Sequence, residues 1–90
     1  MLDIVSSNRF KKDLKLAIKR GYNINLLEDV VKRLAMQIQL EEKYKDHELS
    51  GDFKGFRECH ITPDWLLIYQ IMDNELFLYL SRTGTHSDLF

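Results

Sequence analysis

The sequence predicts an α+β fold of two layers, in which an antiparallel sheet carries an N-terminal helix hairpin packed on one face. Two segments in the first half have apolar side chains at helical spacing. Three strand-like runs separated by short turns follow in the second half, and one short alternating segment precedes the helices. The predicted element order is therefore β-α-α-β-β-β, and the length suits one domain over residues 1–90.

The first predicted helix follows a strand over residues 2–5. Ser6 or Ser7 can cap this helix at its start, and Gly21 can end it just beyond Arg20. Its apolar and basic side chains fall on opposite faces. The basic face is either simply solvated, or it approaches RNA phosphates or an acidic partner. The apolar stripe comprises Phe10, Leu14, Ala17 and Ile18, and the basic face comprises Lys11, Lys12, Lys15 and Lys19.

A second helix is predicted over residues 26–39. Asn25 and Glu28 have the spacing of a capping box at its start. The loop between the two helices is short, which favours an antiparallel hairpin. The residues that we expect to face the core are Leu27, Val30, Val31, Leu34 and Ile38.

Three strands are predicted in the second half of the chain. The middle one, residues 65–72, is almost continuously apolar, which is typical of a central strand covered on both faces. Pro63 and Asp64 turn the chain before it, and Asp73 and Asn74 form a tight hairpin after it. The three predicted strands span residues 56–61, 65–72 and 76–81.

Composition limits the class of protein. A single cysteine, Cys59, excludes an internal disulfide and suits a reducing cytoplasm. No apolar run approaches the roughly 20 residues that cross a bilayer, so we expect a cytoplasmic protein with no membrane partner. The net charge of −1 hides an asymmetry, since residues 1–33 carry eight basic and four acidic side chains, whereas residues 34–90 carry five and ten. The basic N-terminal part leaves nucleic-acid binding open.

All three histidines lie in the second half, each within a short polar string that contains a carboxylate. Histidine titrates near neutral pH and is the usual general acid or base at a phosphate or acyl centre. His47, His60 and His86 are 13 and 26 residues apart. Zinc ligands usually come in closely spaced pairs, so we predict no metal site. The pattern indicates a surface site for acid–base chemistry.

Strand parity relates the residues of the predicted strand 56–61. Alternate residues of a strand face opposite sides, so Glu58 and His60 share one sheet face. A carboxylate there can orient the imidazole or act beside it as a base; the alternative is a pair of solvent-exposed polar residues. Cys59 and Arg57 point to the other face, where we expect Cys59 to be a buried apolar residue rather than a nucleophile.

The C-terminal segment supplies further candidates. Arg82 can bind a phosphate, or it can simply pair with Glu58 or Asp88. The tail beyond it is either disordered, as exposed termini often are, or folded back onto the sheet. In the second case His86 would act as an acid and Phe90 as a platform for base stacking.

Four motifs occur together and in order along the chain. They are YKDH (44–47), L-x-G (49–51), GFRECHITPDWLLIY (55–69) and RTGTHSDLF (82–90). The combination resembles the YafQ branch of the RelE/ParE toxin superfamily over essentially the whole chain. The resemblance implies a RelE-like fold and the toxin of a type II toxin–antitoxin pair, which cuts mRNA in the ribosomal A site without a metal ion or other cofactor.

The resemblance also implies a mechanism and partners. RNA is cut by attack of its own 2′-hydroxyl on the adjacent phosphate, which needs a base, an acid and cations. The implied partners are a cognate antitoxin protein, the ribosome and its mRNA, with operator DNA contacted only through the antitoxin. Two alternatives are a ParE-type gyrase poison and a catalytically degenerate module that only binds an antitoxin and helps repression. The three histidine strings argue against the first, and the acidic balance of residues 34–90 leaves the second open.

The motifs carry implied roles for individual residues. We expect His86 to be the general acid and His60 or Glu58 to be the base, although Glu58 stands where other members carry Asp. His47 and Asp64 would position reacting groups. The other implied residues are the C-terminal aromatic Phe90 and the phosphate contacts Lys45, Lys54, Arg57 and Arg82.

Overall fold

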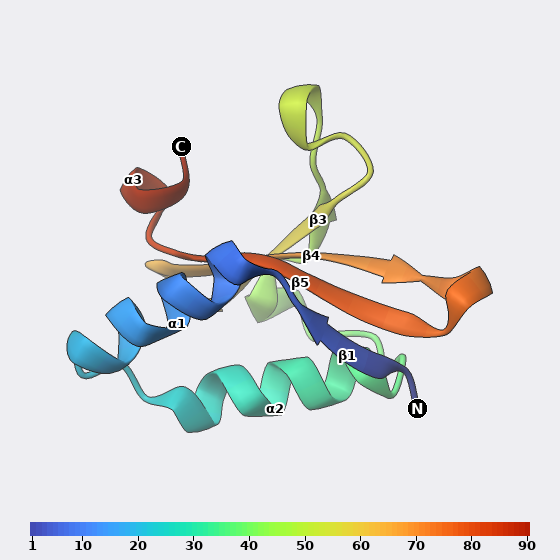
Figure 1. Ribbon diagram of the computed structural model, residues 1–90, viewed down its shortest axis with the longest axis horizontal. Coiled ribbons are helices and arrows are strands. Elements are labelled where there is room, and N and C mark those ends of the chain that lie inside the picture. Colours follow the sequence, from blue (N-terminus) through green and yellow to red (C-terminus); the bar gives the residue numbers. More distant parts are fainter.

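Five strands form one sheet in the computed structural model, which describes residues 1–90 (Figure 1). The strand order is β1-β5-β4-β3-β2. Strands β3, β4 and β5 pair in antiparallel fashion, as predicted, and β2 pairs antiparallel to β3. At one edge, however, β1 runs parallel to β5, which the long intervening stretch of chain allows. The strands span Asp3–Ser6 (β1), His47–Glu48 (β2), Arg57–Thr62 (β3), Trp65–Met72 (β4) and Phe77–Gly84 (β5).

Helices α1 and α2 cover one face of the sheet, and the short α3 lies on the other (Figure 1). Ser7 caps α1 by accepting a hydrogen bond from the amide of Phe10 at 2.9 Å, and Gly21 follows its end with a φ of 80°, both as predicted. Ile18, in contrast, is exposed, because it lies about 80° around the helix from Phe10, at the margin of the buried stripe. The helices span Asn8–Lys19 (α1), Ile24–Ala35 (α2) and His86–Leu89 (α3).

The second helix begins and ends earlier than predicted. Asn23 is its cap, and its side chain accepts from the amide of Asn25 at 3.1 Å, so the predicted capping box of Asn25 and Glu28 is wrong. The helix ends early because the chain turns at Gln37, whose φ of 57° lies in the left-handed region. Ile38 is therefore exposed, whereas the other four residues predicted to face the core are buried.

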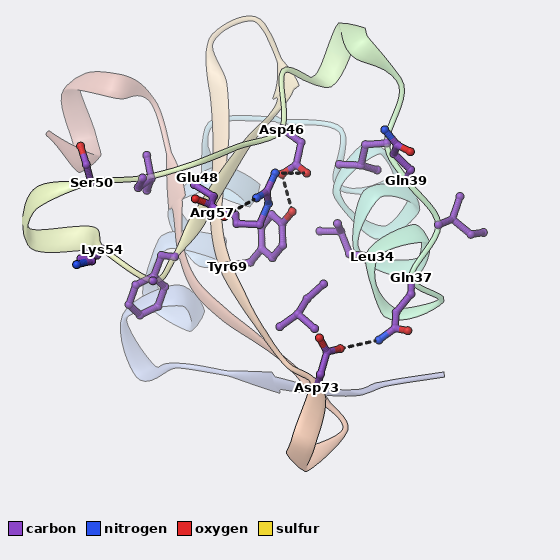
Figure 2. A pocket seen from close by; sticks show the side chains of 16 residues that line it. Leu34, Gln37, Gln39, Asp46, Glu48, Ser50, Lys54, Arg57, Tyr69 and Asp73 are labelled. Carbon is purple, nitrogen blue, oxygen red and sulfur yellow. Dashed lines mark hydrogen bonds and ion pairs between the residues drawn. The ribbon is translucent and has the colours of Figure 1, made fainter.

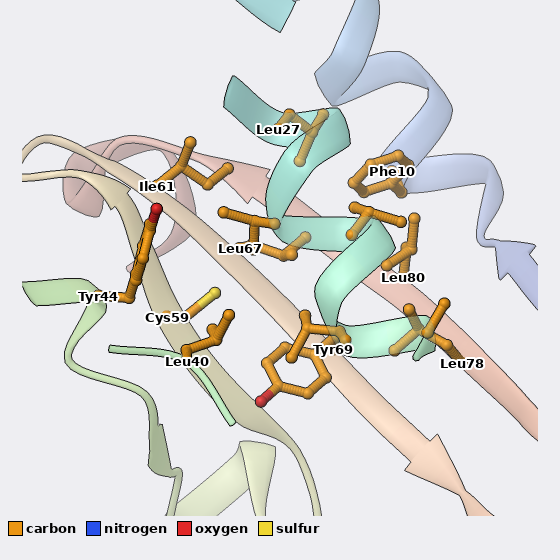
Figure 3. Packing of buried hydrophobic residues seen from close by; sticks show 14 of the residues in the cluster. Phe10, Leu27, Leu40, Tyr44, Cys59, Ile61, Leu67, Tyr69, Leu78 and Leu80 are labelled. Carbon is orange, nitrogen blue, oxygen red and sulfur yellow. The ribbon is translucent and has the colours of Figure 1, made fainter. Parts of the chain in front are cut away.

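The main core lies between the helices and the sheet (Figure 3). Apolar side chains of α2 face those of β3, β4 and β5 across this layer. Cys59 is fully buried among them, as predicted, and burial raises the pKa of its thiol, which disfavours the nucleophilic thiolate. The residues of this core include Phe10, Leu27, Val30, Leu34, Ile61, Leu67, Tyr69, Leu78 and Leu80.

Strand β4 lies at the centre of the sheet and is covered on both faces, as predicted. Its first five residues are all buried. Leu67 and Tyr69 belong to the helix-side core, while Leu66 and Ile68 form a second, smaller cluster with Leu89 of α3. We call the sheet face that carries this second cluster, opposite α1 and α2, the open face.

Strand β5 continues three residues further than predicted, to Gly84. A bulge at Ser81 shifts its register against β4, so that Leu80 faces the helices while Arg82 faces the open face. The tight turn predicted between β4 and β5 is a three-residue helical turn, Asp73–Glu75. The longer β5 brings Arg82 into the sheet itself.

Two short elements have no counterpart in the predicted order. Strand β2 has two residues, and helix α3 has four. Because α3 folds the tail back onto the sheet, the alternative of a disordered tail is wrong. None of the helices has the length and apolar character that a bilayer crossing requires.

A buried hydroxyl joins β4 and β5. Thr83 is 2% exposed, accepts from Nε1 of Trp65 at 2.8 Å and donates to the carbonyl of Leu66 at 2.7 Å. We expect Thr83→Val to lower the free energy of unfolding by about 1–3 kcal/mol, because both partners lose a hydrogen bond in a dry site. Urea unfolding measures this change. Thr62→Val, at a half-exposed site, should cost less than about 0.5 kcal/mol, and equal costs would contradict the prediction.

Candidate functional site

The register of the sheet gathers polar side chains on the open face. His47 of β2 lies opposite Glu58 of β3, Glu58 lies opposite Ile68 of β4, and Ile68 lies opposite Arg82 of β5. Directly opposed residues of neighbouring strands share a face, so these side chains form one row across the sheet. His60, two residues beyond Glu58, lies on the same face, as strand parity predicted.

Glu58 lies between two imidazole rings. Its Oε1 is 3.6 Å from Nε2 of His47 and 3.8 Å from Nε2 of His60. The Nδ1 of His47 is 2.7 Å from the carbonyl oxygen of Lys45, and the Nδ1 of His60 is 3.4 Å from that of Pro63. A carbonyl oxygen only accepts, so we assign a hydrogen to Nδ1 in both rings. The Nε2 of each ring then faces the same carboxylate oxygen.

Burial differs sharply within this group. Glu58 is 6% exposed, whereas the side chains of His60 and His47 are 25% and 49% exposed. The alternative of a solvent-exposed pair is therefore wrong for the carboxylate. A ligand on the open face can reach the imidazoles while Glu58 stays shielded behind them, which suits proton transfer to or from that ligand.

The C-terminal tail folds over the open face. A capping box begins α3, and Leu89 is buried against β4. The ring centroid of His86 is 5.0 Å from that of Phe90. Phe90 in turn is 5.5 Å from Phe53, in the turn Gly51–Phe53 between β2 and β3. The tail thus brings an imidazole and exposed aromatic surface to the same face as the other two histidines.

A salt bridge to α1 holds α3 in place. The Nη1 and Nη2 of Arg20 donate to the two carboxylate oxygens of Asp88 at 2.6 and 3.1 Å. Asp88 also accepts from the backbone amide of Thr85 at 2.9 Å. These hydrogen bonds, that from Arg20 above all, hold the pKa of Asp88 well below its ordinary value.

Arg82 is also held by α1. Its Nε and Nη2 donate to the carboxylate of Asp13 at 2.7 and 3.2 Å. The predicted alternatives of pairing with Glu58 or Asp88 are wrong, because α1 packs against β5 and brings Asp13 closer. Three of the five guanidinium N–H groups have no partner in the chain and remain for a ligand.

Three of the predicted site residues lie on the helix side of the sheet, apart from the histidine cluster, and a fourth, Lys45, precedes β2. Asp64 lines a cavity of about 320 Å³ beside Trp65, on the helix side of the sheet. Arg57 also points to the helix side, as its parity predicted, and together with Lys54 it lines a larger cavity of about 1020 Å³ (Figure 2). Lys45 is exposed on the chain just before β2.

Sequence reasoning missed three residues that shape the site. Asp13 of α1 holds Arg82, Arg20 at the C-terminal cap of α1 holds Asp88, and Phe53 contacts Phe90. One feature of the sequence could have indicated such a contact, because Asp13 is the only acidic residue of an otherwise basic helix. Its partner is 69 residues away, which no local pattern reveals.

The chain matches a known protein family and is similar to proteins of known structure. Residues 2–90 match the family described as the bacterial toxin of type II toxin–antitoxin system, YafQ. The mRNA interferase toxin YafQ of Escherichia coli strain K12 is 44% identical over 89 residues, which cover 98% of this chain and 95% of that protein. In the crystal structure of the E. coli DinJ–YafQ complex, the matching chain is 43% identical with a TM-score of 0.89, covering 100% of this chain and 99% of that one.

One similar structure is a crystal structure of a metal-bound toxin from Helicobacter pylori. It is 52% identical, with a TM-score of 0.94, and covers all of both chains. In the present chain no group of three or more His, Cys, Asp or Glu side chains is arranged to hold a metal ion. Metal-independent chemistry stays a prediction.

The Arg20–Asp88 bridge leads to a pH-dependent stability. Because the pKa of Asp88 is lower in the folded than in the unfolded chain, the bridge contributes fully above the unfolded value of about 3.9 and fades as the pH falls toward the folded value. Asp88→Asn should therefore be less stable than wild type at pH 7, with a difference that shrinks below about pH 4.

Urea unfolding between pH 3 and pH 7 measures this dependence. Arg20→Gln removes the other half of the bridge and should show the same trend. A stability difference that stays constant over this range would contradict the assignment of the bridge to the carboxylate of Asp88.

Proposed function

The chain belongs to the YafQ family of bacterial type II toxin–antitoxin toxins and is an mRNA interferase, and we propose that it cuts ribosome-bound mRNA by acid–base catalysis on the open face of its sheet. The observation that carries this proposal is the shielded carboxylate of Glu58 between the Nε2 atoms of His47 and His60. Such a group can take up and release protons beside a bound RNA without a metal ion or other cofactor.

The proposed reaction is attack of the RNA 2′-hydroxyl on the adjacent phosphate. A base takes the proton of the 2′-hydroxyl, the 2′-oxygen bonds to phosphorus, and the bond to the 5′-oxygen breaks as an acid protonates that oxygen. We assign the base to His60 or Glu58 and the acid to His86, while His47 shares the carboxylate with His60. The products are a 2′,3′-cyclic phosphate and a free 5′-hydroxyl.

Charge on the phosphate during attack needs nearby cations. Arg82 lies in the same row as Glu58 and has unpartnered N–H groups, and Lys45 precedes His47 on the exposed chain. These two are better placed to contact phosphates than Arg57, which binds Asp46, or Lys54, which lines the cavity on the helix side.

The remaining motif residues act, in this proposal, around the reacting groups. Phe90 is 57% exposed and lies against His86, so it can stack on a base of the bound codon. Asp64 lies in the β3–β4 turn, next to the Pro63 carbonyl that holds Nδ1 of His60. Its proposed role is to shape that turn.

The proposed partners follow from the family and from surface charge. E. coli YafQ forms a complex with DinJ, and we propose that a cognate antitoxin binds this chain. An acidic segment of that antitoxin fits the basic face of α1, where four lysines are exposed. We further propose that the toxin acts on translating ribosomes in the cytoplasm and meets operator DNA only through the antitoxin.

Cleavage by single variants tests the proposed roles. We expect His60→Ala and His86→Ala each to slow cleavage by about 10²–10⁴-fold, because each removes a proton-transfer group. Primer extension on a defined mRNA in a purified translation system, with and without ribosomes, measures the rate. Asn74→Ala, in the exposed β4–β5 turn, is the control and should cut like wild type.

Other outcomes would identify which part fails. Undiminished cleavage by both histidine variants, with folding checked by circular dichroism, would overturn the assigned roles but leave the toxin family intact. Absence of cleavage by folded wild type would favour the module that only binds an antitoxin, or the gyrase poison. A supercoiling assay separates those two.

A further inference from the structure

Asp46 connects the two faces of the sheet at the edge that carries the histidines. The residue that follows it, His47, places its ring on the open face against Glu58. The side chain of Asp46 itself points to the opposite side, into the larger cavity that Figure 2 shows. Successive residues of an extended chain point to opposite faces, so fixing one side chain fixes the direction of the next.

Both carboxylate oxygens of Asp46 are bound by residues of interior strands. Oδ1 accepts from the hydroxyl of Tyr69 at 2.5 Å, and Oδ2 accepts from Nη2 of Arg57 at 3.1 Å (Figure 2). Tyr69 and Arg57 are directly opposed on β4 and β3, and Tyr69 is only 1% exposed. Burial, reinforced by the bond to Asp46, raises the pKa of Tyr69, so the hydroxyl keeps the proton that it donates.

Beyond the pairing of β2 with β3 and the contact of His47 with Glu58, two other contacts involve side chains of β2. Glu48 lies 3.6 Å from Nη1 of Arg57, and Nδ1 of His47 lies 2.7 Å from the Lys45 carbonyl oxygen. The strand has two residues and lies at the edge of the sheet, with β3 as its one neighbour. Lys45, just before Asp46, has a left-handed φ of 49°, so the chain bends sharply before the strand begins. The side chain of His47 is half exposed. A short edge strand of this kind opens easily unless side chains anchor it.

We infer that Asp46 is a positioning residue for RNA cleavage, because its hydrogen bonds to Tyr69 and Arg57 hold His47 against Glu58. The inference rests on the proposed function, in which His47 takes part. Asp46 touches no reacting atom, since its carboxylate lies on the other side of the sheet. Without this anchor His47 moves among several positions, and a misplacement of about 1 Å costs on the order of 100-fold in rate.

Nuclear magnetic resonance of the free protein tests the anchor without any activity. Ring ¹⁵N–¹H correlations report the position and tautomer of His47. In Asp46→Ala we expect these signals to shift and broaden, while the signals of His86 stay in place. Glu42→Gln is the matched control, because it removes a nearby exposed acid and leaves Asp46, Arg57 and Tyr69 intact.

A double-mutant cycle tests the connection to catalysis. We expect Asp46→Ala to lower kcat by about 10–100-fold with little change in KM, and to have no further effect on kcat in a His47→Ala background. If Asp46→Ala fails to fold, Tyr69→Phe removes one of the two anchoring bonds at constant shape. That variant should lower kcat by about tenfold or less, and again only while His47 is present.

The outcomes separate the inference from the proposed function. Unchanged His47 signals in folded Asp46→Ala or Tyr69→Phe would overturn the inference. It would also be overturned if either variant lowered kcat by the same factor in the His47→Ala background as in wild type. Full cleavage by His47→Ala would overturn the role of His47 in the proposed function. The ring signals would still decide whether Asp46 holds His47 in place.

Discussion

The covering of β4 on both of its faces is the constraint on which the rest of the structure depends. The helices bury one face, but Leu66 and Ile68 point to the other, and leaving each exposed would forfeit about 1.5–3 kcal/mol. Leu89 of the tail covers them, with Phe53 of the turn between β2 and β3 packed alongside. The helix that covers this apolar patch through Leu89 also carries His86, so it brings His86 to the open face. The same packing that buries β4 therefore assembles the site.

Helix α1 contributes more than cover for the core. The helix and its cap residue hold the C-terminal part of the chain at two points. Asp13 binds Arg82, and the C-terminal cap residue Arg20 binds Asp88, each through two hydrogen bonds. Such fork-shaped pairs fix direction as well as distance. The lysines of the same helix point away from these contacts and stay exposed. One helix thus holds Arg82 and α3 in place while it leaves a separate basic surface exposed.

The sequence predicted those parts of the site that depend on regular periodicity. Glu58 and His60 lie within a six-residue strand, long enough for alternation to assign their face. The approach of His47 was not predictable, because β2 has only two residues and shows no period. The Arg82–Asp13 pair joins residues 69 positions apart, beyond the reach of any local pattern. The end of α2 depended on Gln37, a residue type that gives no signal of a left-handed turn.

Glu58 is much more deeply buried than the two imidazoles that flank it. Glu58 is 6% exposed, so its carboxylate has lost most of its hydration. The two imidazoles come from different strands, and both direct Nε2 to the same oxygen at 3.6 and 3.8 Å. In the proposed reaction, an RNA hydroxyl that engages His60 meets the same Nε2 that faces the carboxylate of Glu58.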